Sequence, residues 1–292
     1  MLELSPDRPA FTVAGVLDRF DPVGPPAPVL FDSPHSGDSY PPDFRPVAPP
    51  AVLRQAEDAW VDELFGAAPR FGATLIRARF PRIYIDPNRA ADDLDPDLVE
   101  GAWPGALAPG EKTRLGVGLI WRFAPPGTAI YDRKLPAAEV RARIDRYYDP
   151  YHDEIARVRD RLFETFGAVW YVDCHSMPGV GGKLSPDPDR PRPDFAIGDR
   201  DGTTCEAAFT EFVVETLRGM GYDVRVNDPY KGAELVRRYG EPESRRHGLQ
   251  IEVNRRLYMD EARHEKHEGF EPLREALTRL AEAIVGYARA AA

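Results

Sequence analysis

Hydrophobic and polar positions along this chain follow two alternating periods, one typical of strands and one typical of helices. Short runs rich in β-branched and aromatic residues predict strands at residues 28–32, 73–78, 82–86, 169–174, 222–226 and 248–253. Between these runs, apolar residues at helical spacing predict helices at residues 51–70, 136–166, 203–219 and 269–290. Because strands alternate with helices, we expect a three-layer α/β fold with a central mixed, largely parallel sheet between helices.

Proline and glycine mark the segments where regular structure is not expected. Residues 1–27 are rich in proline, which removes a backbone donor, so they predict an irregular N-terminal arm. Residues 92–118 and 179–194 combine Asp, Pro and Gly and predict long loops. No segment has the character of a linker, so we expect residues 28–292 to form a single catalytic domain.

Charge and cysteine content limit the partners, the localisation and the disulfide bonds that we expect for this protein. The net charge of -10 over 292 residues disfavours a nucleic-acid partner, since nothing neutralises phosphates in bulk. No run of about 18 apolar residues is present, and the first residues lack the features of a signal peptide, so we expect a cytoplasmic protein without a membrane span. Cys174 and Cys205 are too few for a disulfide framework, and Cys174 is expected to be a buried thiol.

Two histidines stand where strands are expected to end. His35 follows the apolar run at residues 28–32, and His175 follows the run at residues 169–174. Ligands of open α/β sheets gather at the carboxyl ends of strands, and imidazole is a common metal ligand at neutral pH. The two strand ends therefore indicate one shared metal ion.

A metal site at His35 and His175 also needs a carboxylate, because zinc in hydrolases usually takes three His or carboxylate ligands and keeps a fourth position for water. Asp58 and Asp62 are the candidates, four residues apart on one face of the helix predicted at residues 51–70. Asp58 lies nearer the helix start and is our choice, with Asp62 as the residue that orients the site. The alternative for a lone acid here is a helix cap or a solvated side chain.

Two further features carry candidate chemistry. Asn88 and Arg89 follow the strand predicted at residues 82–86, where a planar cation beside an amide suits a substrate carboxylate. The alternative is a structural arginine paired with the aspartates at positions 92, 93 and 95. Glu252 interrupts an apolar strand and is either on the solvent face or a general base whose pKa is raised by burial.

The remaining histidines carry weaker signals. His152 shares a helix face with apolar residues, which favours a structural hydrogen bond over catalysis, whereas His247 precedes the Glu252 strand and is a candidate for the mouth of the site. His264 and His267 lie among charged residues and are expected on a solvated surface.

The order of these elements resembles that of the zinc carboxypeptidase and aspartoacylase-like hydrolases, and more closely that of the N-formylglutamate amidohydrolase (deformylase) family. The segments that carry the resemblance span most of residues 31–261: Pro34–Gly37, Asp58–Leu64, Tyr84–Arg89, Asp149–His152, Asp173–Ser176, Asn227–Gly232 and Gln250–Glu261. Two departures are the long separation of His35 from Asp58, which leaves Asp62 open as the ligand, and Pro87 at the Asn-Arg turn.

The resemblance implies a carboxypeptidase-like fold and hydrolysis of N-formyl-L-glutamate, a small anionic substrate, to formate and glutamate in histidine degradation. It implies one divalent metal, most simply zinc, on His35, Asp58 and His175, and Glu252 as catalytic base. Substrate carboxylates would be bound by Asn88 and Arg89, with Arg122 and Lys231 as candidates for a second cation. The alternatives are a zinc hydrolase of another N-acyl amino acid, or a non-catalytic protein that binds acidic amino acids.

Overall fold

One eight-stranded sheet forms the centre of the protein, in the order β1-β2-β4-β3-β9-β12-β10-β11. The computed structural model describes residues 8–183 and 185–292. The strands are β1 (Phe11–Val13), β2 (Leu17–Phe20), β3 (Val29–Ser33), β4 (Thr74–Ala78), β9 (Val169–Met177), β10 (Phe195–Gly198), β11 (Val224–Val226) and β12 (Arg246–Asn254). The central strands β4, β3, β9 and β12 pair in parallel, and so do β10 and β11. The pairs β1–β2, β2–β4 and β10–β12 are antiparallel, which confirms a mixed, largely parallel sheet.

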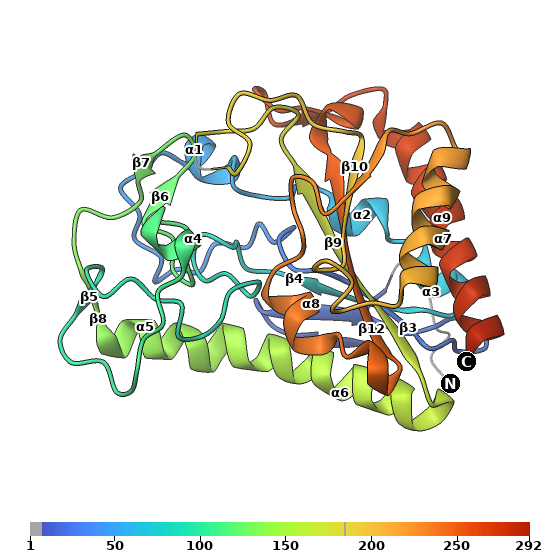
Figure 1. Ribbon diagram of the computed structural model, residues 1–292. Helices are drawn as coiled ribbons and strands as arrows, with labels where there is room; N and C mark the ends of the chain where they lie inside the picture. Colours follow the sequence, from blue (N-terminus) through green and yellow to red (C-terminus); the bar gives the residue numbers. More distant parts are fainter. Residues whose placement is uncertain (1–7, 184) are drawn as a thin grey trace.

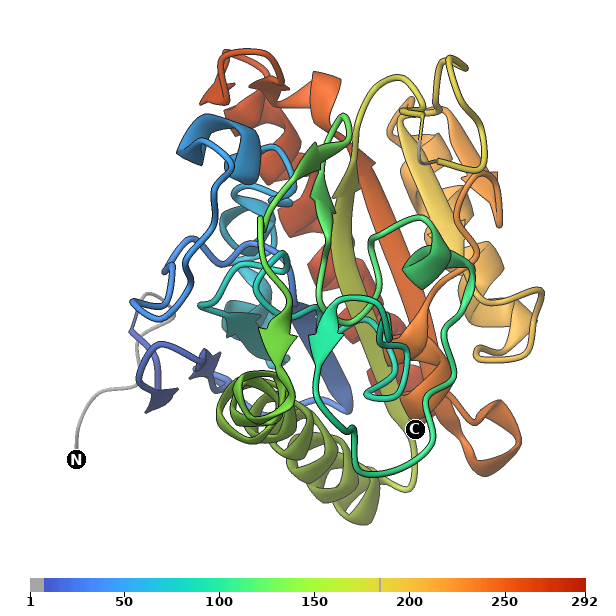
Figure 2. The same ribbon diagram turned by 90° about the vertical axis from the view of Figure 1, so that its left-hand side faces the viewer.

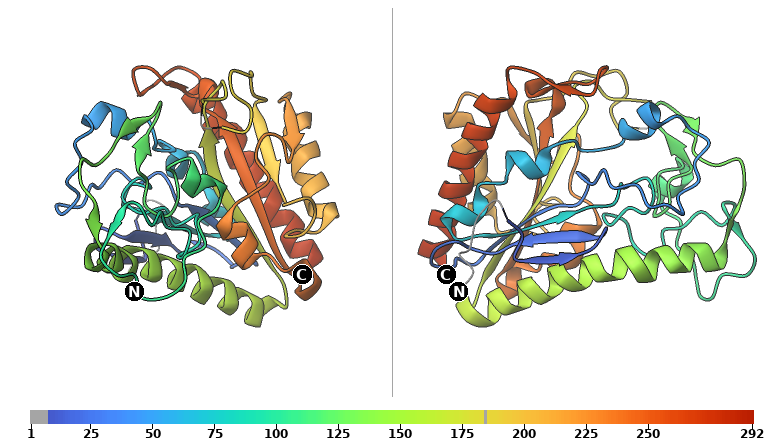
Figure 3. Two further views of the ribbon diagram at one scale, coloured as in Figure 1. Left: turned by 60° about the vertical axis from the view of Figure 1, so that its left-hand side comes forward. Right: turned by 180° about the vertical axis from the view of Figure 1, so that it is seen from behind.

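Helices cover both faces of this sheet and enclose two apolar cores (Figures 1 and 3). One layer contains α2 (Val61–Leu64), α3 (Ala68–Phe71), α7 (Ala207–Gly219) and α9 (Phe270–Ala291). The other contains α5 (Ala137–Arg143), the π-helical turn η1 (Ile144–Tyr148), α6 (Asp149–Phe166) and α8 (Glu234–Tyr239). Strands β9 and β12 are buried on both faces, as expected where helices cover a parallel sheet. The predicted three-layer α/β fold is therefore confirmed.

The shorter elements lie mostly in the connections. They are α1 (Pro50–Arg54), α4 (Glu111–Arg114), β5 (Val99–Glu100), β6 (Phe123–Ala124), β7 (Thr128–Ala129), β8 (Leu135–Pro136), β13 (Met259–Asp260), β14 (Glu265–Lys266) and the 3-10 turns η2 (Pro242–Ser244) and η3 (Arg255–Leu257). Figures 1 and 2 show the segment from β5 to β8, teal to green, standing together on one side of the central strands. This segment includes most of the loop predicted at residues 92–118.

The long helices agree with the sequence pattern at their ends. The helix predicted at residues 136–166 is present as α5, η1 and α6, and it ends at Gly167, whose φ of 74° lets glycine close the last turn. The helix predicted at residues 269–290 is α9. None of the helices in the described ranges is long and apolar enough to cross a membrane.

Three expectations differ from the structure. The arm predicted as irregular contains β1 and β2, which join the main sheet through β4, because its prolines flank residues 10–20 instead of interrupting them; residues 1–7 of the arm lie outside the described residues. Residues 82–86 form a turn, since prolines on both sides prevent strand pairing while Ile83 and Ile85 still reach the core. The helix predicted at residues 51–70 is broken into three short helices, with Trp60 at a φ of 58°.

Candidate active site

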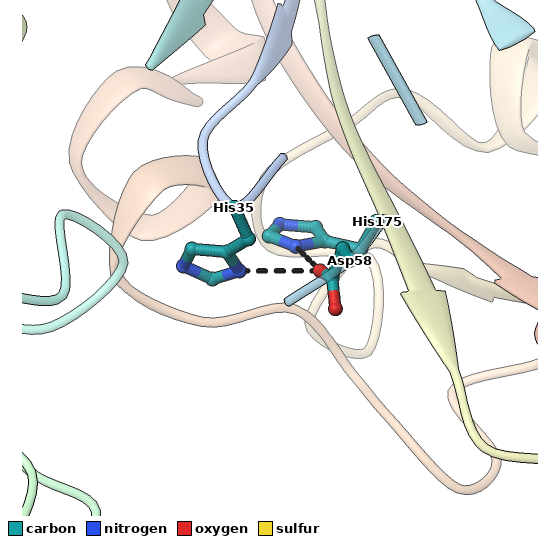
Figure 4. A group of neighbouring side chains, drawn as sticks. All are labelled: His35, Asp58 and His175. Atoms are coloured by element: carbon teal, nitrogen blue, oxygen red, sulfur yellow. Dashed lines mark hydrogen bonds and ion pairs between the residues drawn. The ribbon is translucent and has the colours of Figure 1, made fainter. Parts of the chain in front are cut away.

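His35, Asp58 and His175 converge at the carboxyl edge of the sheet (Figure 4). The strands that carry the two histidines, β3 and β9, are parallel neighbours, so their ends meet at one edge. The Nδ1 atoms of His35 and His175 lie 3.3 and 3.1 Å from Oδ2 of Asp58. All three side chains are buried, and one ligand atom from each lies within 4.8 Å of the other two.

Carboxylates hold the opposite side of both imidazole rings. Nε2 of His35 lies 2.8 Å from Oδ1 of Asp86, and Nε2 of His175 lies 2.7 Å from Oδ1 of Asp173. Such contacts fix the ring orientation and leave Nδ1 facing the shared centre. The sequence analysis missed both aspartates, although Asp173 stands two residues before His175 in β9 and therefore on the same strand face.

Asp58 is oriented by two arginines. Arg255 donates from Nη2 to Oδ1 of Asp58 at 2.9 Å, and Nη1 of Arg82 lies 3.6 Å from the same oxygen. The other oxygen, Oδ2, is the one that meets the imidazoles. Asp62 instead accepts from Arg77 at 2.8 Å, so the orienting role expected for it falls to Asp86 and Asp173. The reason is the left-handed backbone at Trp60, which separates two acids that a continuous helix would have placed on one face.

The charges in this cluster favour a bound cation. Burial raises the pKa of the Asp58 carboxyl, but its bonds to His175 and His35, with Arg82 nearby, outweigh burial and hold that pKa well below its usual value. Burial lowers the pKa of His175, yet Asp173 and Asp58 together raise it well above its usual value. Two imidazole nitrogens and one carboxylate oxygen, fully buried and backed by further carboxylates, form a donor set that fits a divalent ion such as zinc.

Glu252 lies beside this cluster on β12. The β12 strand pairs in parallel with β9 so that Glu252 is the register partner of His175. Its side chain is buried, which excludes the solvent-face alternative. Gln250 donates from Nε2 to Oε1 of Glu252 at 2.9 Å. Burial, reinforced by the Asp58 carboxylate, raises the pKa of Glu252 to about 7 against the opposing effect of His175, which is suitable for a general base at neutral pH.

Asn88 and Arg89 lie at the same edge of the sheet, but their side chains have different hydrogen-bond partners. The Asn88 amide nitrogen is 3.1 Å from Nε2 of His175, and its oxygen accepts from the backbone N–H of Leu235 at 2.8 Å. Both ends of the amide therefore have partners within the protein, and the amide nitrogen lies next to His175. Arg89 donates from Nε to the Val117 carbonyl at 3.0 Å and from Nη1 to the Asn88 carbonyl at 2.8 Å.

Arg122 and Lys231 are not brought to the cluster. Both are well exposed at the surface, where Arg122 pairs with Asp95 at 3.2 Å and Lys231 pairs with Asp201 at 2.8 Å. The cations whose charges act on Glu252 or its neighbours are others, which the sequence analysis missed: Arg82, Lys112 and Arg192. Arg82 could have been found from its spacing of four residues to Asp86, whereas no local pattern marks Lys112 or Arg192.

The remaining histidines have structural roles or lie elsewhere. His152 is buried, with Nδ1 2.8 Å from the Tyr239 hydroxyl and Nε2 2.9 Å from the Pro87 carbonyl oxygen, which confirms a structural hydrogen bond. His247 stacks on Trp170 at the opposite end of β12 from Glu252, so its expected place at the mouth of the site was wrong. Cys174 is a buried thiol, as expected.

The fold and this site define a class: an α/β protein whose buried His-Asp-His cluster and neighbouring glutamate have the composition of a hydrolytic metal centre. The family model described as N-formylglutamate amidohydrolase matches residues 27–259. An N-formylglutamate deformylase of Pseudomonas putida is 29% identical over 248 residues, covering 80% of this chain and 82% of the relative. The chain therefore belongs to the N-formylglutamate amidohydrolase family, whose members are hydrolases acting on an amide.

Solved structures agree with this assignment. The crystal structure of an N-formylglutamate amidohydrolase from Ralstonia eutropha JMP134 is similar at a TM-score of 0.90 and 48% identity, covering 95% of this chain and 100% of that one. A gene product of Agrobacterium tumefaciens shares the fold at a TM-score of 0.68 and 20% identity, covering 95% of this chain and 96% of that one.

Proposed function

We propose that this protein hydrolyses N-formyl-L-glutamate to formate and L-glutamate, the reaction expected in histidine degradation, with one zinc ion held by His35, Asp58 and His175. The observation that carries the proposal is the position of Glu252. It is buried beside His175, next to three side chains whose donor atoms fit a divalent ion. Family membership supports the formyl amide as the bond that is cleaved.

The residues of the chain divide the chemistry between them. A bound zinc ion would supply Lewis-acid polarisation of the formyl oxygen and lower the pKa of a water molecule. Glu252, with a pKa of about 7, takes a proton from the attacking water as its oxygen bonds to the formyl carbon. Glu252 then returns that proton to the amide nitrogen as the carbon–nitrogen bond breaks, which releases formate and the free amine of glutamate.

The supporting residues keep this geometry fixed. Asp86 and Asp173 hold the far sides of the imidazoles, and Gln250 holds one oxygen of Glu252. Because the groups are buried and prearranged, little reorganisation is needed in the transition state. Arg89, anchored by two backbone carbonyls, supplies a positive charge for a substrate carboxylate.

A substrate panel tests the proposal. Purified protein is loaded with zinc or stripped by a chelator and assayed with the N-formyl, N-acetyl and N-succinyl derivatives of glutamate and aspartate. We expect zinc-dependent release of formate, with N-formyl-L-glutamate the best substrate. Preference for an acetyl or succinyl group would favour another N-acyl amino acid, and binding of these compounds without turnover would favour a non-catalytic binding protein.

A further inference from the structure

Four cations surround Glu252 and its neighbours, but only two of them are neutralised within the protein. Arg82 donates to Asp86 at 3.0 and 3.2 Å. Arg192 donates to both oxygens of Asp187 and to the Pro178 carbonyl, so each of its three guanidinium nitrogens has a partner. These two arginines have little capacity left for a substrate anion.

Arg89 retains a free donor edge. Its Nε and Nη1 atoms are used by backbone carbonyls, while Nη2 has no hydrogen-bond partner in the described part of the chain. Nη1 lies 3.9 Å from Oδ2 of Asp86, an oxygen that already accepts from Arg82 and from the Trp121 indole. Burial and the neighbouring Arg82 lower the pKa of Arg89 against the opposing effect of Asp86. The guanidinium is therefore held in a position where the surrounding negative charge is not enough to neutralise it.

Lys112 is tied to Arg89 through the backbone. The Lys112 carbonyl accepts from the Val117 N–H at 2.9 Å, and the Val117 carbonyl accepts from Nε of Arg89 at 3.0 Å. Helix α4, which carries Lys112, lies in the segment between β5 and β6 that stands beside the central strands (Figure 2). The contact through Val117 connects this segment with Arg89, which is far from it in sequence.

The ammonium group of Lys112 has no hydrogen bond or ion pair with any described residue, although the side chain is half-buried. Burial lowers its pKa, and the nearby Arg89 lowers it further. Cations that are removed from water are normally paired. Two cations whose charges act on each other, linked through Val117 and each with unused donors, form a site for an anion that the protein itself does not supply.

The geometry points to Lys112 as the residue that binds the side-chain carboxylate of an N-formylated dicarboxylic amino acid, while Arg89 binds its α-carboxylate. This inference rests on the proposed function. Arg89 directly follows Asn88, which contacts His175, so its guanidinium is anchored next to the residues that would hold the scissile amide. The α-carboxylate is one carbon from the amide nitrogen. The side-chain carboxylate lies further from that nitrogen, and Lys112 is, among the described residues, the second unpaired cation whose charge is felt by Arg89 and Glu252.

Matched substrates and variants test the assignment. N-formyl-L-glutamate and N-formyl-L-glutamine differ only in the charge of the side-chain group. We expect Lys112→Met to lower kcat/KM on N-formyl-L-glutamate by about 10- to 100-fold, the range for a charged hydrogen bond, and on the glutamine compound by less than about threefold. Lys112→Arg should keep most of the preference, and Lys134→Met, at an exposed lysine, should leave both rates unchanged.

A second measurement does not depend on turnover of the amide substrate. In Lys112→Met, competitive inhibition by L-glutamate should weaken by a similar factor, while inhibition by L-glutamine should not change. Equal losses on both substrates and both inhibitors, or no loss at all, would overturn the role of Lys112 while leaving the proposed function intact. A wild-type protein that does not hydrolyse N-formyl-L-glutamate would overturn both.

Discussion

Arg255 holds one oxygen of Asp58 and leaves the other for the two imidazoles. Its Nη2 donates to Oδ1 at 2.9 Å, while Oδ2 faces Nδ1 of both histidines. The same guanidinium donates to the Ser176 hydroxyl and the Gln55 carbonyl, each at 3.0 Å. Arg255 thereby connects the end of β12 with β9 and with the turn that carries Asp58, and it fixes the rotamer of the candidate ligand.

The first prediction concerns this contact. Arg255→Met should weaken zinc affinity by about 10- to 100-fold, the usual cost of removing a group that orients a metal ligand. Competition with a fluorescent chelator would measure it. Arg256→Met is the matched control, because Arg256 is the next residue but is half exposed and pairs with Asp194. Equal affinities in the two variants would show that Asp58 does not depend on Arg255.

The second prediction separates the two candidate acids. Asp58→Asn should abolish tight metal binding, because it removes the charged oxygen that faces both imidazoles. Asp62→Asn should retain the metal, since Asp62 pairs with Arg77 away from the cluster. Metal analysis of the purified variants decides the matter. Retention of a full equivalent in Asp58→Asn would exclude the proposed ligand set.

The third prediction tests the general base. Glu252→Gln preserves the shape of the side chain and removes its proton-accepting charge, so kcat should fall by roughly 10²- to 10⁴-fold while metal content stays the same. Formate release and metal analysis on one preparation provide both readings. Near-normal turnover would mean that another group accepts the proton of the attacking water.

The sequence predicted the centre of the site because local pattern and sheet geometry agree there. His35 follows β3 and His175 lies near the end of β9, and parallel strands end at one edge of the sheet, so two residues far apart in sequence are brought together. Glu252 could be placed for a similar reason, since β12 pairs in parallel with β9. Strand periodicity therefore carried most of the correct information.

The substrate cations were harder to predict, because loops do not reveal where they return. Arg122 and Lys231 are the candidates for a second cation in the sequence, yet both lie at the surface, paired with Asp95 and Asp201. Lys112 is connected to Arg89 through Val117, whose N–H donates to the Lys112 carbonyl and whose carbonyl accepts from Nε of Arg89, and no local pattern encodes this contact. The backbone at Trp60 is a similar case, since a tryptophan with a positive φ cannot be expected from helical spacing.

The last prediction uses the buried His152. Its Nε2 donates to the Pro87 carbonyl, and its Nδ1 lies 2.8 Å from the Tyr239 hydroxyl oxygen, which itself donates to the His152 carbonyl. The Pro87 contact supports the turn that presents Asn88 and Arg89. Burial, with a smaller contribution from Arg238, lowers the pKa of His152 from 6.5 to about 3. Above pH 6.5 the ring is neutral in both the folded and unfolded chain and contributes no pH dependence.

Between pH 6.5 and pH 3 the unfolded chain binds a proton at His152 that the folded protein does not, so the free energy of unfolding falls as the pH falls. The contribution is about 1.4 kcal/mol for each pH unit. His152→Gln keeps a donor and an acceptor but cannot titrate. Urea unfolding at about pH 7.5, 5.5 and 4.5 should therefore show the variant losing less stability on acidification than the wild type. Parallel profiles would mean that His152 binds its proton equally well in the folded and the unfolded protein, and would contradict the lowered pKa.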